Sequence, residues 1–103
     1  YDLAICLNSW GFDRSGFFNP ERSEAIISAY CKKRMLTRRE YDALPLLCRG
    51  SALRFLLTRL YDWMNVPEAA TVSAKDPLEY LNKLVFHRTV NGSADYGYVL
   101  PHG

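Results

Sequence analysis

Apolar and polar residues follow one another along the chain with the period of an α-helix, about 3.6 residues. Apolar side chains recur at this spacing in several stretches, and residues that start or stop helices bound each stretch. The pattern predicts helices over residues 3–10, 20–34, 38 to a break at Pro45, 46–64, and 77 to about 90. None of these stretches shows the alternation expected of a β-strand. We therefore predict an all-α fold of about five helices.

Capping residues set the predicted helix boundaries. Asp2 can cap the first helix, and Asn19 followed by Pro20 is a strong start signal for the second. Thr37 and Glu40 have the spacing of a capping box, so the third helix should begin at residue 38. The remaining stop and start signals are Pro45, Asn65-Val66-Pro67 and Asp76-Pro77.

Each predicted helix has an apolar face that we expect to be buried. The longest, over residues 46–64, is apolar around most of its circumference, which is typical of a helix that others surround. The side chains expected in the core are Leu3, Cys6, Leu7, Trp10, Ile26, Ile27, Tyr30, Leu53, Leu56, Leu57, Leu60, Tyr61, Met64, Leu78, Leu81, Leu84 and Val85.

Two of the three arginines on the long helix, Arg49 and Arg59, are candidates for an anion site. Arg54 shares a polar strip with Thr58 and Asp62, whereas Arg49 and Arg59 lie among apolar positions. A buried guanidinium must be paired, so we expect either an internal ion pair or a bidentate fork that binds a ligand carboxylate. The acids considered as internal partners are Glu40, Asp42 and Asp62.

Composition narrows the class of protein. The chain has 103 residues, 49% of them hydrophobic, which is enough apolar material for one folded domain. Its net charge of +2 is too small for general attraction to nucleic acid or anionic lipid, and no run is long enough for a membrane helix. Three scattered cysteines suit free thiols in a reducing compartment, so we expect a cytoplasmic protein without disulfides or a zinc site.

Residues for self-contained catalysis are scarce. The sequence holds no glycine-rich phosphate loop, no nucleophile elbow and no zinc-protease motif. Its histidines are His87, expected at a helix surface or half-buried, and His102 near the end. A basic cluster over residues 32–39 should be a solvated helix end, with a phosphate-contacting patch as the alternative.

Four segments resemble homoserine kinases of the choline-kinase-like type, whose fold is similar to that of aminoglycoside phosphotransferases. They are YDLAICLNSW at 1–10, LPLLCRGSALRFLLTRLYDW at 44–63, KDPLEYLNKL at 75–84 and DYG at 95–97. The resemblance covers nearly the whole chain. It implies that residues 1–103 are the helical C-terminal subdomain of an enzyme that phosphorylates the side-chain hydroxyl of L-homoserine in threonine biosynthesis.

The same resemblance implies that ATP and Mg²⁺ are bound in a nucleotide-binding lobe that precedes Tyr1. The chain starts without an initiator Met, as a fragment would, and we expect the 103 residues alone to be inactive. Faces that would pack on the missing lobe should then be exposed and should favour self-association.

Candidate site residues also follow from the resemblance. Asp2 matches an acid that supports the catalytic loop in related enzymes, a role that here reduces to helix capping. Asn8 and Trp10 match the segment that approaches the acceptor. The candidates for binding the homoserine carboxylate are Arg49, Arg54 and Arg59. Arg49 and Arg59 are favoured because they lie among apolar positions.

Two other interpretations stay open. A related kinase for choline, methylthioribose or an aminoglycoside would share the fold, although choline would require an aromatic and acidic cage in place of arginines. A non-enzymatic helical interaction module is the second, and the basic cluster over residues 32–39 supports it.

Overall fold

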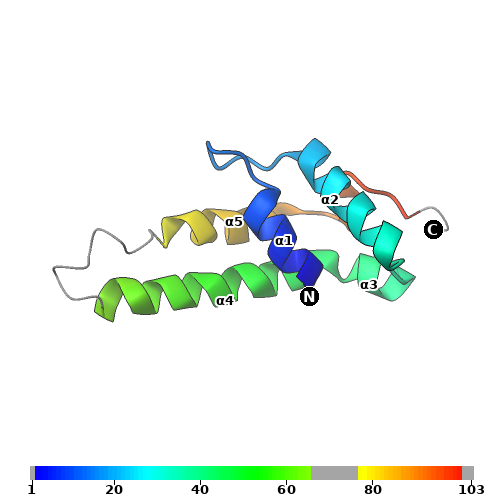
Figure 1. Ribbon diagram of the computed structural model, residues 1–103. Helices are drawn as coiled ribbons and strands as arrows, with labels where there is room; N and C mark the ends of the chain where they lie inside the picture. Colours follow the sequence, from blue (N-terminus) through cyan, green and yellow to red (C-terminus); the bar gives the residue numbers. More distant parts are fainter. Residues whose placement is uncertain (1, 66–76, 101–103) are drawn as a thin grey trace.

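The computed structural model describes residues 2–65 and 77–100, which form five α-helices and a short 3₁₀-helix (Figure 1). The helices are α1 (Asp2–Trp10), α2 (Pro20–Lys33), α3 (Arg38–Asp42), α4 (Leu44–Asn65), α5 (Leu78–Thr89) and η2 (Ser93–Tyr96). Within the described ranges the β-structure is one isolated bridge between Phe12 and Phe18. The prediction of an all-α fold is confirmed.

The caps of α2 and α3 form as predicted. Asn19 accepts a hydrogen bond from the backbone N–H of Arg22 at 3.0 Å, and Pro20 is the first residue of α2. Thr37 and Glu40 cap each other's backbone N–H groups at 3.0 and 3.1 Å. The residue types alone therefore predicted where α2 and α3 begin.

Two other boundaries differ from the prediction or lie outside the described residues. Helix α1 begins at Asp2, so this acid lies in the first turn and does not precede the helix as its cap. Its charge is still favourable there because the N-terminal end of a helix dipole is positive. The predicted loop to Lys75, the cap Asp76 and the C-terminal His102 fall outside the described residues.

Helix α4 runs along one side of the molecule, and its last turns reach past α1 (Figure 1). It packs against α5 and α1, while α2 packs against α1 and η2. The molecule measures 53 × 27 × 23 Å, with a radius of gyration of 15.0 Å. A compact domain of this length has a radius of gyration of about 13 Å, so the fold is elongated along α4.

The main core lies where α1, α2, η2 and the first half of α4 meet. Its largest fully buried apolar side chains are Leu7, Ile27, Leu44 and Tyr96. A second, smaller cluster joins α4 to α5 through Ala52, Leu56 and Tyr80. No helix within residues 2–65 and 77–100 is both long enough and apolar enough to cross a membrane.

The predicted burial of the long helix is wrong over its second half. Leu56 is buried, but the rest of the predicted apolar stripe is exposed: Leu53, Leu57, Leu60, Tyr61 and Met64. These residues lie on sides of α4 that the other described elements leave exposed. An apolar circumference shows that a helix suits burial, but it does not show that a partner is present in the same chain.

The predicted inner face of α5 is also wrong, except at Leu84, which is half-buried against the smaller cluster. Leu78, Leu81 and Val85 are exposed, whereas Tyr80, Lys83 and His87 are buried. These three residues lie on one side of the helix, and the two polar ones form internal hydrogen bonds. Smaller differences affect α1 and α2, where Cys6 and Trp10 are exposed and Ile26 and Tyr30 are only half-buried.

Candidate functional site

A hollow of about 670 Å³ opens between the end of α1, the middle of α4 and the start of α5. We call it the main hollow, and it is lined by Ser9, Trp10, Phe55, Arg59, Glu79, Tyr80 and Lys83. A side hollow of about 250 Å³ shares Ser9, Glu79 and Lys83 with it and continues under the loop that follows α1. The volume of the main hollow suits a small metabolite, and both charged and aromatic side chains face it.

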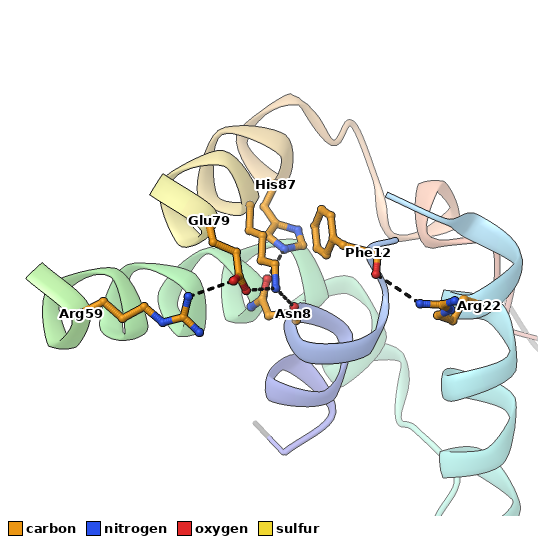
Figure 2. A network of polar contacts seen from close by, with 7 residues as sticks. Asn8, Phe12, Arg22, Arg59, Glu79 and His87 are labelled. Atoms are coloured by element: carbon orange, nitrogen blue, oxygen red, sulfur yellow. Dashed lines mark hydrogen bonds and ion pairs between the residues drawn. The ribbon is translucent and has the colours of Figure 1, made fainter. Parts of the chain in front are cut away.

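Three charged side chains form a network at the boundary of the two hollows (Figure 2). Glu79 Oε1 lies 3.1 Å from Arg59 Nη1, and Glu79 Oε2 accepts a hydrogen bond from Lys83 Nζ at 3.0 Å. Lys83 also donates to the backbone carbonyl of Asn8 near the end of α1. The network therefore connects α1, α4 and α5 at the site.

Tyr80 supports both cations of this network. Its ring centre lies 4.3 Å from the guanidinium carbon of Arg59 and 4.6 Å from Lys83 Nζ. Cations at such distances are attracted to the negative face of an aromatic ring. The Phe55 ring stacks on Tyr80 with centroids 5.3 Å apart, which fixes the tyrosine in turn.

Arg59 lies mostly buried at the wall of the main hollow. Only 15% of its side chain is exposed, and its partner is Glu79 rather than any of the predicted acids. Nη1 is within ion-pair distance of that carboxylate, but its N–H bonds do not point at it. Among the described residues it is buried without a hydrogen bond. Since two cations share one carboxylate, the network carries one net positive charge and favours an anionic ligand group.

Glu79 is ionised at neutral pH. Partial burial alone would raise its pKa, but the hydrogen bond from Lys83 and the positive charges of Lys83 and Arg59 outweigh burial and hold the pKa below its usual value. Its side chain is 51% exposed, so part of the carboxylate faces the hollows.

A buried polar chain begins at Asn8, which is fully buried and whose backbone carbonyl accepts the hydrogen bond from Lys83. Asn8 Nδ2 donates to the backbone carbonyl of Cys48 at 3.1 Å, so Asn8 Oδ1 faces His87 Nε2 at 2.6 Å. Because an amide oxygen only accepts, His87 carries its proton on Nε2. His87 Nδ1 then accepts from the Tyr96 hydroxyl at 2.9 Å. Hydrogen-bond directions thus fix the histidine tautomer.

His87 is 1% exposed, which contradicts the predicted surface or half-buried position. Burial, and then the positive charges of Lys83 and Arg49, lower its pKa to about 4. The ring is therefore neutral at pH 7. Burial likewise raises the pKa of the Cys48 thiol to about 12, so neither group is a reactive acid or nucleophile at neutral pH.

The structure brings together some of the predicted site residues and separates others. Trp10 and Arg59 line the main hollow, whereas Asn8 does not, and its side chain belongs to the buried polar chain. Arg49 and Arg54 are exposed and line neither the main hollow nor the side hollow. Asp2 lies exposed at the opposite end of α1 from Trp10.

Sequence reasoning missed Glu79, Tyr80 and Lys83 as site residues. A signal was present, since Glu79 and Lys83 are four residues apart and would pair on one helix face. The apolar pattern of α5 outweighed this pairing signal, because its leucines indicated that the opposite face of the helix is buried. Among the described residues, no group of three His, Cys, Asp or Glu side chains could hold a metal ion.

No protein-family model matches the chain. The chain is similar to proteins named homoserine kinase, at 58% identity over 98 residues in Methylobacterium sp. (strain 4-46) and 58% over 97 residues in Sinorhizobium medicae. The homoserine kinase of Agrobacterium fabrum is 55% identical over 97 residues. These alignments cover 94 to 95% of this chain but only 30% of each relative. The chain is thus homologous to part of the homoserine kinases, and the resemblance read from its sequence is confirmed.

Proposed function

We propose that this chain is the helical C-terminal part of a cytoplasmic homoserine kinase, and that its main hollow binds the acceptor amino acid. The whole enzyme would transfer a phosphoryl group from MgATP to the side-chain hydroxyl of L-homoserine, in threonine biosynthesis. The similarity to homoserine kinases over 95% of the chain supports this proposal. MgATP would be bound by other parts of the longer protein, since this chain spans only 30% of the length of its relatives.

The observation that carries the proposal is the state of Arg59 in the main hollow. Its guanidinium is held by Tyr80 and lies beside Glu79, and it keeps one buried nitrogen without a hydrogen bond among the described residues. An amino-acid carboxylate in the main hollow would pair with this guanidinium, and the excess positive charge of the network favours that end of the ligand. Trp10, Phe55 and Tyr80 provide apolar walls for the methylene groups of homoserine.

The chemical contribution of these residues is positional. Phosphoryl transfer depends on holding the attacking hydroxyl in line with the phosphoryl group, and much of an enzyme's rate enhancement comes from such orientation. A carboxylate fixed by Arg59 would anchor one end of homoserine and limit the positions open to its hydroxyl. The isolated 103-residue chain should therefore bind the acceptor but be inactive.

The test is the Arg59→Met substitution in the longer protein that carries this chain. We expect the KM for L-homoserine to rise at least about tenfold with a smaller change in kcat, because a charge-assisted pair that positions the substrate is lost. ADP release measured against homoserine concentration gives both constants. The matched controls are Arg49→Met and Arg54→Met, whose side chains lie outside the hollow and should leave KM within about twofold.

Two results would contradict the proposal. If the longer protein does not phosphorylate L-homoserine, the assigned activity is wrong. If Arg59→Met lowers thermal stability but leaves KM unchanged, then Arg59 is a structural residue of the α4–α5 contact.

Choline is the alternative acceptor, and the aromatic and acidic lining of the main hollow is an observation in its favour. Trp10, Phe55, Tyr80 and Glu79 are the aromatic and acidic side chains that a quaternary ammonium requires. Arg59 and Lys83 repel such a cation, and for this reason we prefer the amino acid. Choline as acceptor in the same assay separates the two functions.

A further inference from the structure

Glu79 has unused capacity to accept hydrogen bonds on the side that faces the hollows. Oε1 lies beside Arg59 and Oε2 accepts from Lys83, but each carboxylate oxygen has two acceptor positions. About half of the side chain is exposed, and it lines both the main and the side hollow. The carboxylate can therefore hold its internal partners and a ligand cation at the same time.

Glu79 is also fixed in place. Lys83, which holds it, is only 8% exposed, bonds to the backbone of Asn8 and contacts the rings of Tyr80 and Phe12 at 4.6 and 5.3 Å. A group held in this way loses little conformational freedom when a ligand binds. Lys83 itself is largely enclosed by these partners, so its main contribution to the site is to hold Glu79.

From this geometry we propose that Glu79 binds the α-ammonium group of the acceptor, so that Arg59 and Glu79 together select an amino-acid zwitterion. In an α-amino acid the ammonium and carboxylate groups are attached to one carbon atom. The protein presents the matching pair, a guanidinium and a carboxylate 3.1 Å apart at the wall of one hollow. This inference rests on the proposed function and adds the specificity-determining role of Glu79.

Selection of a zwitterion predicts how substrate analogues behave. 4-Hydroxybutyrate keeps the hydroxyl and carboxylate of homoserine but lacks the ammonium group. If that group is bound by Glu79, the wild-type enzyme should prefer homoserine over 4-hydroxybutyrate by at least about tenfold in kcat/KM, since hydrogen bonds between charged groups are strong. A site that binds only the carboxylate would give similar kcat/KM values for the two acids.

The experiment is Glu79→Gln in the longer protein, with kcat/KM measured for both acids in the presence of MgATP. We expect the preference for homoserine to fall about tenfold or more, because the activity on homoserine drops and the activity on 4-hydroxybutyrate is retained. The matched control is Glu24→Gln, an exposed acid on α2 whose hydrogen bond to Ser28 a glutamine can preserve. It should leave the preference unchanged.

The preference is a ratio measured in one preparation, so a partly unfolded variant does not alter it. An unchanged ratio in Glu79→Gln would overturn the inference while homoserine kinase activity stands. Equal use of both acids by the wild-type enzyme would overturn it as well. A wild-type protein that phosphorylates neither acid would instead refute the proposed function.

Discussion

At the scale of single residues, His87 shows how burial and hydrogen bonding determine charge. Its Nε2–H donates to Asn8 and its Nδ1 accepts from Tyr96, so both nitrogens are occupied by the neutral ring. Protonation would place a second donor against the tyrosine hydroxyl and add a charge near Lys83 and Arg49. This arrangement is consistent with the pKa of about 4.

The lowered pKa of His87 predicts acid sensitivity of the fold. The unfolded chain takes up a proton on this histidine below about pH 6.5 and the folded chain only below about pH 4, so unfolding is favoured between these values. The free energy of unfolding should be fully retained above about pH 6.5. It should fall by roughly 3 kcal/mol as the pH drops to about 4.

Urea unfolding of the chain across this pH range measures the effect. His87→Gln has no titrating ring and should lose most of the slope between about pH 4 and about pH 6.5, although it is less stable at pH 7. The same slope in the variant would assign the acid sensitivity to other groups.

Residue types alone could not assign Lys83 and His87 to the interior. Lysine is rarely buried without a partner, and the partner carbonyl of Asn8 and the carboxylate of Glu79 come together only in three dimensions. Arg59 could be predicted in part, because its apolar surroundings indicated a paired guanidinium. Its partner was Glu79, an acid on another helix that spacing along α4 cannot reveal.

At the scale of elements, helix ends were predictable, whereas helix faces were predictable only in part, as at Leu3, Leu7 and Ile27. Caps are local, so Asn19, Thr37 and Glu40 determine the starts of α2 and α3 without help from the rest of the fold. The face that a helix buries depends on what packs against it. For α5 the covering elements are α1 and α4, and they select the side with Tyr80 and His87.

Gly97 provides a test of how η2 joins the rest of the fold. Its φ is +90°, and a Cβ atom there would lie 2.5 Å from the backbone oxygen of Pro20 at the start of α2. Gly97→Ala should therefore reduce the free energy of unfolding by about 1 to 3 kcal/mol, because both the backbone conformation and the contact become unfavourable.

Thermal or urea unfolding gives this value, and Gly92→Ala is the matched control. A methyl group added at Gly92 would meet no atom within 4 Å beyond its chain neighbours, and the backbone there is extended, with φ of −169°. A similar loss in both variants would show that the contact with Pro20 is not what requires glycine.

At the scale of the whole molecule, the exposed apolar side chains gather on the second half of α4 and on the outer side of α5. A groove of about 190 Å³ between these helices is lined by Leu56, Leu60, Pro77, Leu78 and Leu81. Contiguous exposed apolar surface is typical of surfaces that contact another protein or another part of the same protein.

We predict that the isolated chain self-associates through this surface. Met64→Lys should raise the concentration at which the chain associates by about tenfold or more, since its side chain is 79% exposed and lies on the patch. Sedimentation at several concentrations measures the effect. Met35→Lys, at an exposed position between α2 and α3, is the control, and equal effects of both changes would exclude this patch as the contact.

One uninterrupted helix carries both the carbonyl of Cys48 that anchors Asn8 and the guanidinium of Arg59 that faces the main hollow. Adding or removing one residue between these positions would rotate everything beyond it by about 100° and turn Arg59 away from Glu79. The loop over residues 11–18 can absorb such a change because it is mostly exposed. The segment of α4 between Cys48 and Arg59 can therefore diverge in sequence but not in length, whereas the exposed loop tolerates insertions and deletions.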